Sequence, residues 1–457
     1  GGDGGCGAAM GRARGGGGRL RGDVRRRARA RRTQPVRGGR LLPAGAARLV
    51  PVGLGADGAG ARGLAARRAG GARRLRAAAR ARLRGRARQR RAGRRDPGRG
   101  ARVGARMSGE GAMAAEGVRF EVCGRLGLIT LDRPKAMNAL THAMALAMED
   151  RLRAWAEDDA VASVAVVGAG EKAFCAGGDI RALHAEGPEN GARNFAFYAD
   201  EYRLNTLIKR FPKPYVAFMD GVAMGGGVGV SVHGSHRVAG DRTLFAMPET
   251  GIGLFPDVGG TYFLPRLPGE TGLWLGLTGA RLKTGDAVAA GVCDLYVPSA
   301  KTGAALDALA DGAAPDAALA ALAAEPEGAT LPGLRPAIDR CFAGESVEAV
   351  LEALAAEGSD WAAAQRDAIL GKSPASTRIA FRQLRMGAGL DFEDCMRLEY
   401  RLARWCMTHP DFYEGVRATI LDRDGAPRWR PASLSDADDA FVADAFAPPP
   451  PGAELGL

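Results

Sequence analysis

The stretch Lys213–Gly229, KPYVAFMDGVAMGGGVG, combines a short apolar run with a series of glycines. Its first part, residues 214–219, is a short apolar run bounded by Pro and Gly, which predicts a buried strand. Glycines follow, and the apolar residues from Val230 to His233 predict a helix. Glycines between a strand and a helix let backbone N–H groups approach a ligand. The alternative is a tight helix–strand contact that needs small residues.

Similar units flank this stretch on both sides. Residues 118–134 alternate in two short bursts, which predicts a β-hairpin. Residues 163–168 and 237–239 predict further strands. A helix is expected from Thr141, and its predicted buried face comprises Met144, Leu146, Met148, Leu152 and Trp155. Strands and helices that alternate in units of this size indicate an α/β fold.

The rest of the chain has a helical pattern. Residues 301–345 are rich in Ala and carry four prolines, which predicts short helices on a variable connection. Helical periodicity resumes over residues 347–408. We therefore expect a core over residues 114–300, a helical connection over 301–345 and a C-terminal helical region over 346–440.

Positive charge is concentrated in the first 106 residues. They contain 31 arginines, no lysine and four acidic residues, a net charge of +27, whereas residues 107–457 carry a net charge of −14. This Arg/Gly/Ala-rich tail has no aromatic residue and cannot bury enough apolar surface to offset chain entropy. We therefore expect the tail to be disordered.

Three interpretations of the tail are open. The first is upstream sequence in a GC-rich frame that is not part of the native protein, with Met107 or Met113 as the true start. The second is a nucleic-acid-binding arm, since arginines neutralise phosphates, although no aromatic residues are interleaved for base stacking and we do not expect this partner. The third is a transit peptide, which should carry serine, but the first serine is Ser108.

Cysteine usage and hydropathy indicate the compartment. The seven cysteines are scattered without any C-x-x-C pair, which favours reduced intracellular thiols over a disulfide or zinc framework. The sequence shows neither a run of 18 apolar residues nor a secretory signal, so we expect no membrane span. The predicted location is cytoplasmic, or the mitochondrial matrix in a eukaryote.

A second glycine loop, residues 174–180 (FCAGGDI), has the same layout as the first. It leads into a helix through Leu183, with Asp179 as the predicted N-cap. The first loop lacks the Lys of a phosphate-binding loop, and Val230 breaks the G-x-G-x-x-G pattern. What remains is an oxyanion hole, to which each loop could supply one N–H donor.

Two carboxylates stand out in residues 246–260, AMPETGIGLFPDVGG. Glu249 and Asp257 lie among apolar residues, Gly and Pro, where a buried charge is costly without a partner or a function. Such a pair suits acid–base or nucleophilic catalysis. The structural alternatives are a capping or ion-paired Glu249, and a turn-forming Asp257 after Pro256.

Residues 229–234, GVSVHG, are a near miss to the nucleophile elbow G-x-S-x-G. One residue too many separates Ser231 from the last glycine, and Ser231 falls in a predicted helix rather than at a turn. Both features disfavour a Ser-triad hydrolase. His233 and His236 have no accompanying acid cluster, so we expect packing or hydrogen-bonding roles and no metal site.

Four motifs occur in order over roughly residues 118–300: ITLDRPKAMNAL, KAFCAGGDI, KPYVAFMDGVAMGGGVG and FAMPETGIGLFPDVGGTYFLPRL. Their order and spacing resemble the crotonase (enoyl-CoA hydratase/isomerase) superfamily. The resemblance implies a spiral of ββα units, an acyl-CoA substrate and no cofactor, CoA being part of the substrate. It also implies that the N–H groups of Gly178 and Gly226 hold the thioester oxygen and that the loop around Ala176 contacts the substrate.

Further motifs, GGGVGVSVHG, AMPETGIGLFPDVGG, SPAS, MRLEYRLA and DFYEGVRA, are similar to the 3-hydroxyisobutyryl-CoA hydrolase branch over roughly residues 118–435. Hydratases of the superfamily carry two glutamates, and here the first position is Gly229 and the second is Glu249. Asp257 stands where hydratases usually have Gly. The resemblance implies that Glu249 attacks the thioester or activates a water, and that Asp257 holds the 3-hydroxyl group of the substrate.

Glu201 aligns with a substrate-contacting glutamate of the family, although an acid beside Arg203 in a helix is ordinarily on a solvated face. The implied reaction is hydrolysis of 3-hydroxyisobutyryl-CoA, or of 3-hydroxypropionyl-CoA, in valine breakdown. An enoyl-CoA hydratase or isomerase is the alternative within the superfamily, and Gly229 is the feature against it. An RNA-associated relative that uses the Arg-rich tail is a remote alternative. The oligomeric state stays open.

Overall fold

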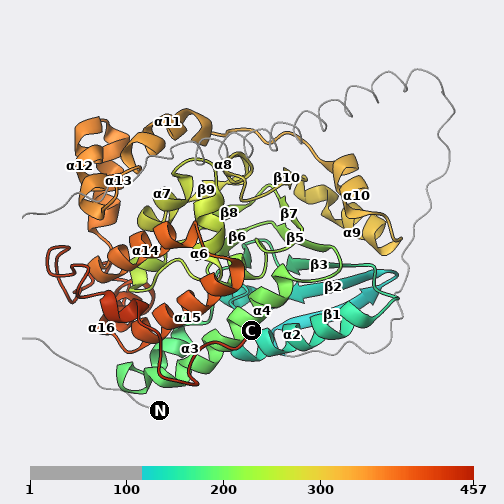
Figure 1. Cartoon of the computed structure of the whole chain (residues 1–457). Coiled ribbons are helices and arrows are strands. Elements are labelled where there is room, and N and C mark those ends of the chain that lie inside the picture. The colour runs from blue at the N-terminus through green and yellow to red at the C-terminus, as the bar shows by residue number, and fades with distance from the viewer. Residues whose placement is uncertain (1–115) are drawn as a thin grey trace, which may run out of the picture. The chain divides into compact units, whose positions relative to one another are not determined.

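The computed structural model describes residues 116–457, whose strands form two sheets (Figure 1). The larger sheet has the order β1-β2-β3-β5-β7-β10, and these strands span Val118–Cys123, Leu126–Leu131, Ser163–Gly168, Tyr215–Met219, His236–Ala239 and Leu295–Tyr296. The smaller sheet has the order β4-β6-β8-β9, and its strands span Ala173–Cys175, Val222–Met224, Leu244–Ala246 and Leu282–Lys283. The prediction of a disordered tail over residues 1–106 lies outside the described residues.

From β3 to β8, successive strands alternate between the two sheets. In the pairs β3 and β4, β5 and β6, and β7 and β8, the first strand joins the larger sheet and the second joins the smaller one. Strands β3, β5 and β7 are parallel, as are β4, β6 and β8. This repeated step is the predicted spiral, so the α/β architecture is confirmed. The loops that follow β4, β6 and β8 leave the same edge of the smaller sheet, which is where parallel sheets bind ligands.

The predicted hairpin is the antiparallel pair β1 and β2, with a register from Val118 opposite Leu131 to Cys123 opposite Leu126. Gly124 in its turn has a φ of 58°, which glycine adopts without strain.

Helix α2 spans His142–Glu157 and starts as predicted at Thr141, whose Oγ1 accepts the N–H of Met144 at 3.2 Å. Four residues of the predicted buried face are buried: Met144, Met148, Leu152 and Trp155. Leu146 is 41% exposed, so its predicted burial is wrong. At about 100° per residue it lies about 200° from Met144, on the opposite side of the helix.

The helix predicted from Val230 to His233 is also wrong. Helix α5 spans only Gly226–Gly229, and residues 231–233 form turns behind it. Val230 and Ser231 are fully buried. Their apolar surroundings reflect a buried turn, which periodicity cannot distinguish from a helix in so short a run.

The remaining helices surround the sheets and extend beyond them (Figure 1). Those of the core are α3 (Ile180–Ala185), α4 (Phe195–Lys209), α6 (Gly260–Phe263), α7 (Thr271–Thr278) and α8 (Thr284–Ala290). The short helices predicted for residues 301–345 are α9 (Thr302–Ala310), α10 (Pro315–Leu322) and α11 (Leu331–Cys341). The C-terminal helices are α12 (Val347–Glu357), α13 (Asp360–Leu370), α14 (Pro374–Gly387), α15 (Phe392–Met407) and α16 (Pro410–Val416).

The larger sheet is covered on its two faces by different parts of the chain. On one face, Val216 and Phe218 pack with Leu309 of α9 and Leu319 of α10. On the other face the main core includes α2 and α4, and α15 packs against α4 and α6, so the C-terminal region adjoins the core. The proposed division at residues 300 and 345 stays a prediction. Within residues 116–457, no helix is both long and apolar enough to cross a membrane.

Candidate active site

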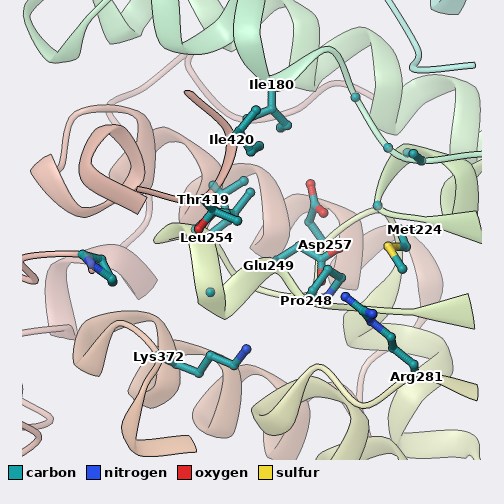
Figure 2. A pocket seen from close by; sticks show the side chains of 18 of the residues that line it. Ile180, Met224, Pro248, Glu249, Leu254, Asp257, Arg281, Lys372, Thr419 and Ile420 are labelled. Atoms are coloured by element: carbon teal, nitrogen blue, oxygen red, sulfur yellow. The ribbon is translucent and has the colours of Figure 1, made fainter. Parts of the chain in front are cut away.

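A cavity of about 520 Å³ lies where the loops after β4, β6 and β8 meet the C-terminal region (Figure 2). Residues from distant parts of the sequence line it. All of the residues that the sequence singled out for the site are among them: Ala176, Gly178, Glu201, Gly226, Glu249 and Asp257. The fold therefore brings the predicted residues together in one place.

The two glycine loops form one wall of this cavity. They follow the neighbouring parallel strands β4 and β6. A Cβ atom added to Gly226 would lie 3.2 Å from the backbone nitrogen of Gly178 and 2.5 Å from Glu201 Oε1. Gly177 and Gly225 have φ values of 121° and 46°, which residues with side chains rarely adopt. Glycine is thus needed for the backbone path and to keep the space beside the Gly178 amide open.

Glu249 follows β8 and begins the single-turn helix η3 (Glu249–Ile252). Its side chain is buried, and among the described residues its Oε2 has no hydrogen-bond partner. Burial raises the pKa of Glu249 well above its usual range, and the charge of Asp257 raises this pKa further, while Lys372 opposes the shift. The side chain caps no helix and forms no ion pair within residues 116–457, so neither structural alternative fits it.

Asp257 lines the same cavity, in the turn between η3 and α6 (Figure 2). The hydroxyl of Tyr202 donates a hydrogen bond to its Oδ2 at 2.9 Å. Burial raises the pKa of Asp257 to about 7, and the bond from Tyr202 opposes this shift. Its carbonyl oxygen accepts the N–H of Gly260 at 2.8 Å. Asp257 therefore forms the turn that the structural alternative named and also presents a carboxylate to the cavity.

Glu201 lies on α4 and lines the cavity, so the alternative of a solvated face does not hold. The side chain is only 2% exposed, and Arg203 pairs with Asp200 instead, at 2.6 Å. Burial raises the pKa of Glu201 well above its usual range. The helical stripe to which Glu201 belongs was readable from the sequence, because its other members are the buried residues Tyr198, Asn205 and Ile208.

Gly229 occupies the position where hydratases of the superfamily are expected to carry their first glutamate. A Cβ atom added there would lie 2.7 Å from Asn205 Nδ2 and 2.9 Å from Val258 Cβ. The surroundings leave no room for even a methyl group, so they exclude a carboxylate at this position without rearrangement.

Several residues of the cavity were not predicted. The ammonium group of Lys372, between α13 and α14, points toward the cavity, as does Arg281 (Figure 2). Burial lowers the pKa of Lys372, and the charge of Glu249 opposes this shift. Thr419 and Ile420, which follow α16, line another side. Lys372 and Thr419 directly flank the motifs SPAS and DFYEGVRA, but they lie more than 100 positions beyond Glu249, so only the three-dimensional fold places them at the cavity.

The other candidates have structural roles. Asp179 caps α3 as predicted, through the N–H of Ala182 at 3.4 Å. Ser231 is buried and donates to the carbonyl oxygen of Gly227 at 2.7 Å, so it has no triad geometry. His233 Nε2 lies 2.7 Å from the carbonyl oxygen of Val258. In the part of the chain that the structure describes, no group of three or more His, Cys, Asp and Glu residues could hold a metal ion.

Comparisons with known proteins agree with this architecture. The sequence pattern of the enoyl-CoA hydratase/isomerase family matches residues 126–446. A protein of Danio rerio named 3-hydroxyisobutyryl-CoA hydrolase, mitochondrial, is 45% identical to this chain, and the match covers 73% of this chain and 90% of the relative. The human protein of the same name is 42% identical, with 73% of this chain and 89% of the relative covered.

Solved structures with the same fold belong to proteins that are named for other reactions. A carnitinyl-CoA dehydratase from Mycobacterium thermoresistibile is 45% identical, with a TM-score of 0.71 over 75% of this chain and 99% of that chain. An enoyl-CoA hydratase from Rhodobacter sphaeroides 2.4.1 is 41% identical, with a TM-score of 0.70 over 75% of this chain and 100% of that chain. The chain belongs to the enoyl-CoA hydratase/isomerase (crotonase) family, and it is similar there to proteins named 3-hydroxyisobutyryl-CoA hydrolase.

Proposed function

We propose that this protein hydrolyses the thioester of 3-hydroxyisobutyryl-CoA to 3-hydroxyisobutyrate and CoA. One observation carries the proposal: two buried carboxylates, Glu249 and Asp257, face a glycine wall in one cavity, while the packing around Gly229 closes the position of a hydratase glutamate. The relatives named for this activity support the proposal. A second candidate substrate is 3-hydroxypropionyl-CoA, because it presents the same carbonyl and hydroxyl groups.

The glycine wall would stabilise the charge that develops on the thioester. In this proposal the N–H groups of Gly178 and Gly226 donate to the carbonyl oxygen as it becomes an oxyanion. Such donors are aligned before the reaction and lie in a site with little water, so each is typically worth about 10²–10³ in rate. The loop around Ala176 carries the rest of the acyl-CoA past this wall.

Glu249 would supply the chemistry by one of two routes. In the first, its carboxylate oxygen bonds to the carbonyl carbon, the C–S bond breaks, and CoA leaves as a thiolate that takes up a proton. Water then hydrolyses the resulting anhydride. In the second, Glu249 removes a proton from a water whose oxygen bonds to the same carbon; the C–S bond then breaks, and CoA leaves as a thiolate that takes up this proton. Both routes need an ionised Glu249 that no cation neutralises, and its unpartnered Oε2 suits either.

Asp257 would hold the 3-hydroxyl group of the acyl chain. An ionised carboxylate accepts a hydrogen bond from an alcohol. The hydroxyl of Tyr202 donates to Oδ2 of Asp257 and so stabilises the ionised form of this carboxylate. The buried Glu201 lines the cavity beside Gly226 and contacts the substrate in this proposal. We also assign the reaction to valine breakdown, with a mitochondrial location in a eukaryote, because the relatives are named mitochondrial.

Release of CoA from 3-hydroxyisobutyryl-CoA, followed with a thiol reagent, tests the proposal against hydration of crotonyl-CoA. Hydration is the second candidate because solved structures similar to this chain are named carnitinyl-CoA dehydratase and enoyl-CoA hydratase. We expect thiol release from the first substrate and no loss of the enoyl absorbance of the second. Hydration without thiol release would contradict the proposal.

A further inference from the structure

The backbone that carries Asp257 is strained next to the cavity. Val258 has a φ of 51° and Gly259 has a φ of 85°. A β-branched residue is sterically disfavoured in this left-handed region. Such a conformation persists only where the surrounding structure over-determines it, and it concentrates at functional sites. We call residues 256–261 the Asp257 loop. Its contacts with the surrounding structure hold the backbone in this conformation.

Glu399 on α15 makes two of these contacts. Its Oε2 accepts the N–H of Gly259 at 2.7 Å, and its Oε1 accepts the N–H of Thr261 at 2.8 Å. The side chain is fully buried, and it forms no ion pair with any residue of the described range 116–457. A buried carboxylate without a cation is expensive for folding, and an apolar residue would cost less. Because each of its two oxygens accepts a backbone N–H of the Asp257 loop, this carboxylate holds the loop in one conformation.

Two further side chains hold the same loop from other directions. Gln383 on α14 donates to the carbonyl oxygen of Pro256 at 2.5 Å. His233, in the turn behind α5, lies with its Nε2 2.7 Å from the carbonyl oxygen of Val258. A carbonyl oxygen only accepts, so this nitrogen carries the proton. The loop is therefore held at four backbone groups by three side chains that are distant in sequence.

We propose that Glu399 is a positioning residue for the reaction: together with Gln383 and His233, its carboxylate fixes the Asp257 loop so that Asp257 meets the substrate. The C-terminal helical region is then part of the active site, although Glu399 itself touches no substrate. The inference rests on the proposed function, since it uses the role assigned to Asp257.

A double-mutant cycle between Glu399→Gln and Asp257→Asn tests this inference. The glutamine can accept one amide, but its NH₂ group faces the other, so the loop must shift. We expect kcat for 3-hydroxyisobutyryl-CoA to fall about 10- to 100-fold, because small misplacements of a reacting geometry cost this much. KM should change less than about threefold, since the other proposed substrate contacts are the glycine wall and Glu201, which the substitution does not touch. In the Asp257→Asn background the same change should cost less than about threefold, because no carboxylate remains to be placed.

Asp411→Asn is the matched control. Asp411 is also a buried carboxylate of the C-terminal region, but it accepts the hydroxyl of Ser373 at 2.6 Å and the N–H of Arg430 at 2.7 Å, away from the Asp257 loop. Its effect on kcat should be the same with and without Asp257. If Glu399→Gln does not fold, Gln383→Met replaces it in the cycle. Methionine keeps the length and apolar stem, and it removes an Oε1 that has no partner among the described residues.

The outcomes separate the two proposals. If Glu399→Gln lowers kcat by the same factor with and without Asp257, the two losses multiply in the double variant, as we expect for Asp411→Asn. This result would overturn the positioning role and leave the proposed function intact. Absence of CoA release by the unmodified full chain would overturn the proposed function and this inference with it.

Discussion

The two walls of the cavity work by opposite means. The glycine wall depends on missing side chains, since a single Cβ on Gly226 would fill the space beside the Gly178 amide. The acid wall depends on side chains that are costly to bury, Glu249 and Asp257, neither of which has a paired cation among the described residues. Backbone amides do not titrate, whereas burial moves both carboxyl pKa values upward. Variants of the glycine wall should therefore change rates without changing pH profiles, and variants of the acid wall should change both pH dependence and selectivity.

Glu249→Gln should give the largest effect. The amide cannot attack the thioester or remove a proton from water, so we expect kcat to fall about 10³-fold. The loss should be equal for 3-hydroxyisobutyryl-CoA and for isobutyryl-CoA, because both react at the same carbonyl. Thiol release under saturating substrate measures it, with the thermal unfolding midpoint as a control for folding. Activity above one-tenth of the unmodified protein would remove Glu249 from the chemical step.

Gly226→Ala should follow, with a loss of about 10²- to 10³-fold in kcat, since the new methyl group would fill the space beside the Gly178 amide in which the proposed oxyanion forms. The pH profile should keep its shape, because the change adds no charge. Gly333→Ala on α11 is the matched control: its Cβ meets nothing within 4 Å, and it should retain full activity. A profile that moves along the pH axis would show that the two walls are not independent.

Asp257→Asn should lower kcat/KM about 10- to 100-fold for 3-hydroxyisobutyryl-CoA but less than about threefold for isobutyryl-CoA, which has no 3-hydroxyl group. This split would separate the positioning carboxylate from the reacting one. Both substrates are followed by the same thiol assay, so the ratio needs no further calibration. Equal losses on the two substrates would give Asp257 a part in the chemistry itself.

The same contrast explains what the sequence could predict. Glycines between a strand and a helix, and acids among apolar residues, are local features, so the two glycine loops, Glu249 and Asp257 stood out from their neighbours. The family resemblance then singled out Gly178 and Gly226 within the loops, and the structure brings these four residues together in one cavity. The strand and hairpin pattern gave the α/β architecture for the same reason. The roles of these residues in a reaction stay predictions.

What failed or was missed depends on tertiary contacts. The apolar run at residues 230–233 was assigned to a helix, but burial from all sides gives a turn the same composition. For Glu201, predicted as a substrate contact, the alternative of a solvated face rested on its neighbour Arg203 alone and did not take the buried helical stripe into account. Lys372 and Glu399 come from the C-terminal region, more than 100 positions beyond Glu249. They lie beside the motif SPAS and within the motif MRLEYRLA, but nothing in these motifs places Lys372 at the cavity or Glu399 at the Asp257 loop.

Tyr202→Phe should have a smaller, pH-dependent effect on the acid wall. Its hydroxyl lowers the pKa of Asp257 against the effect of burial, which raises that pKa to about 7. Without the hydroxyl, the pKa rises further, so the decline of kcat toward acidic pH should begin at a higher pH. We expect a loss of several-fold near pH 6 and nearly full activity near pH 9, measured as kcat across this range. An unshifted profile would mean that ionisation of Asp257 does not limit the rate.

The smallest effect should be on stability, and it has the opposite sign on the two walls. Burial raises the folded-state pKa of Glu249 above its unfolded value, so the folded state prefers the protonated form. The cost of holding the anion is absent below the unfolded pKa and fully present above the folded one. Glu249→Gln removes this cost, so its thermal midpoint should exceed that of the unmodified protein by about 1–3 °C at pH 8.5, and the gain should fade toward pH 4.5. Gly226→Ala should lower the midpoint at both pH values, because the added methyl group clashes sterically with Glu201 Oε1 whether or not that carboxyl group is protonated. A gain for Glu249→Gln that is equally large at pH 4.5 would arise from packing rather than from charge. It would contradict the claim that the buried Glu249 anion destabilises the folded state.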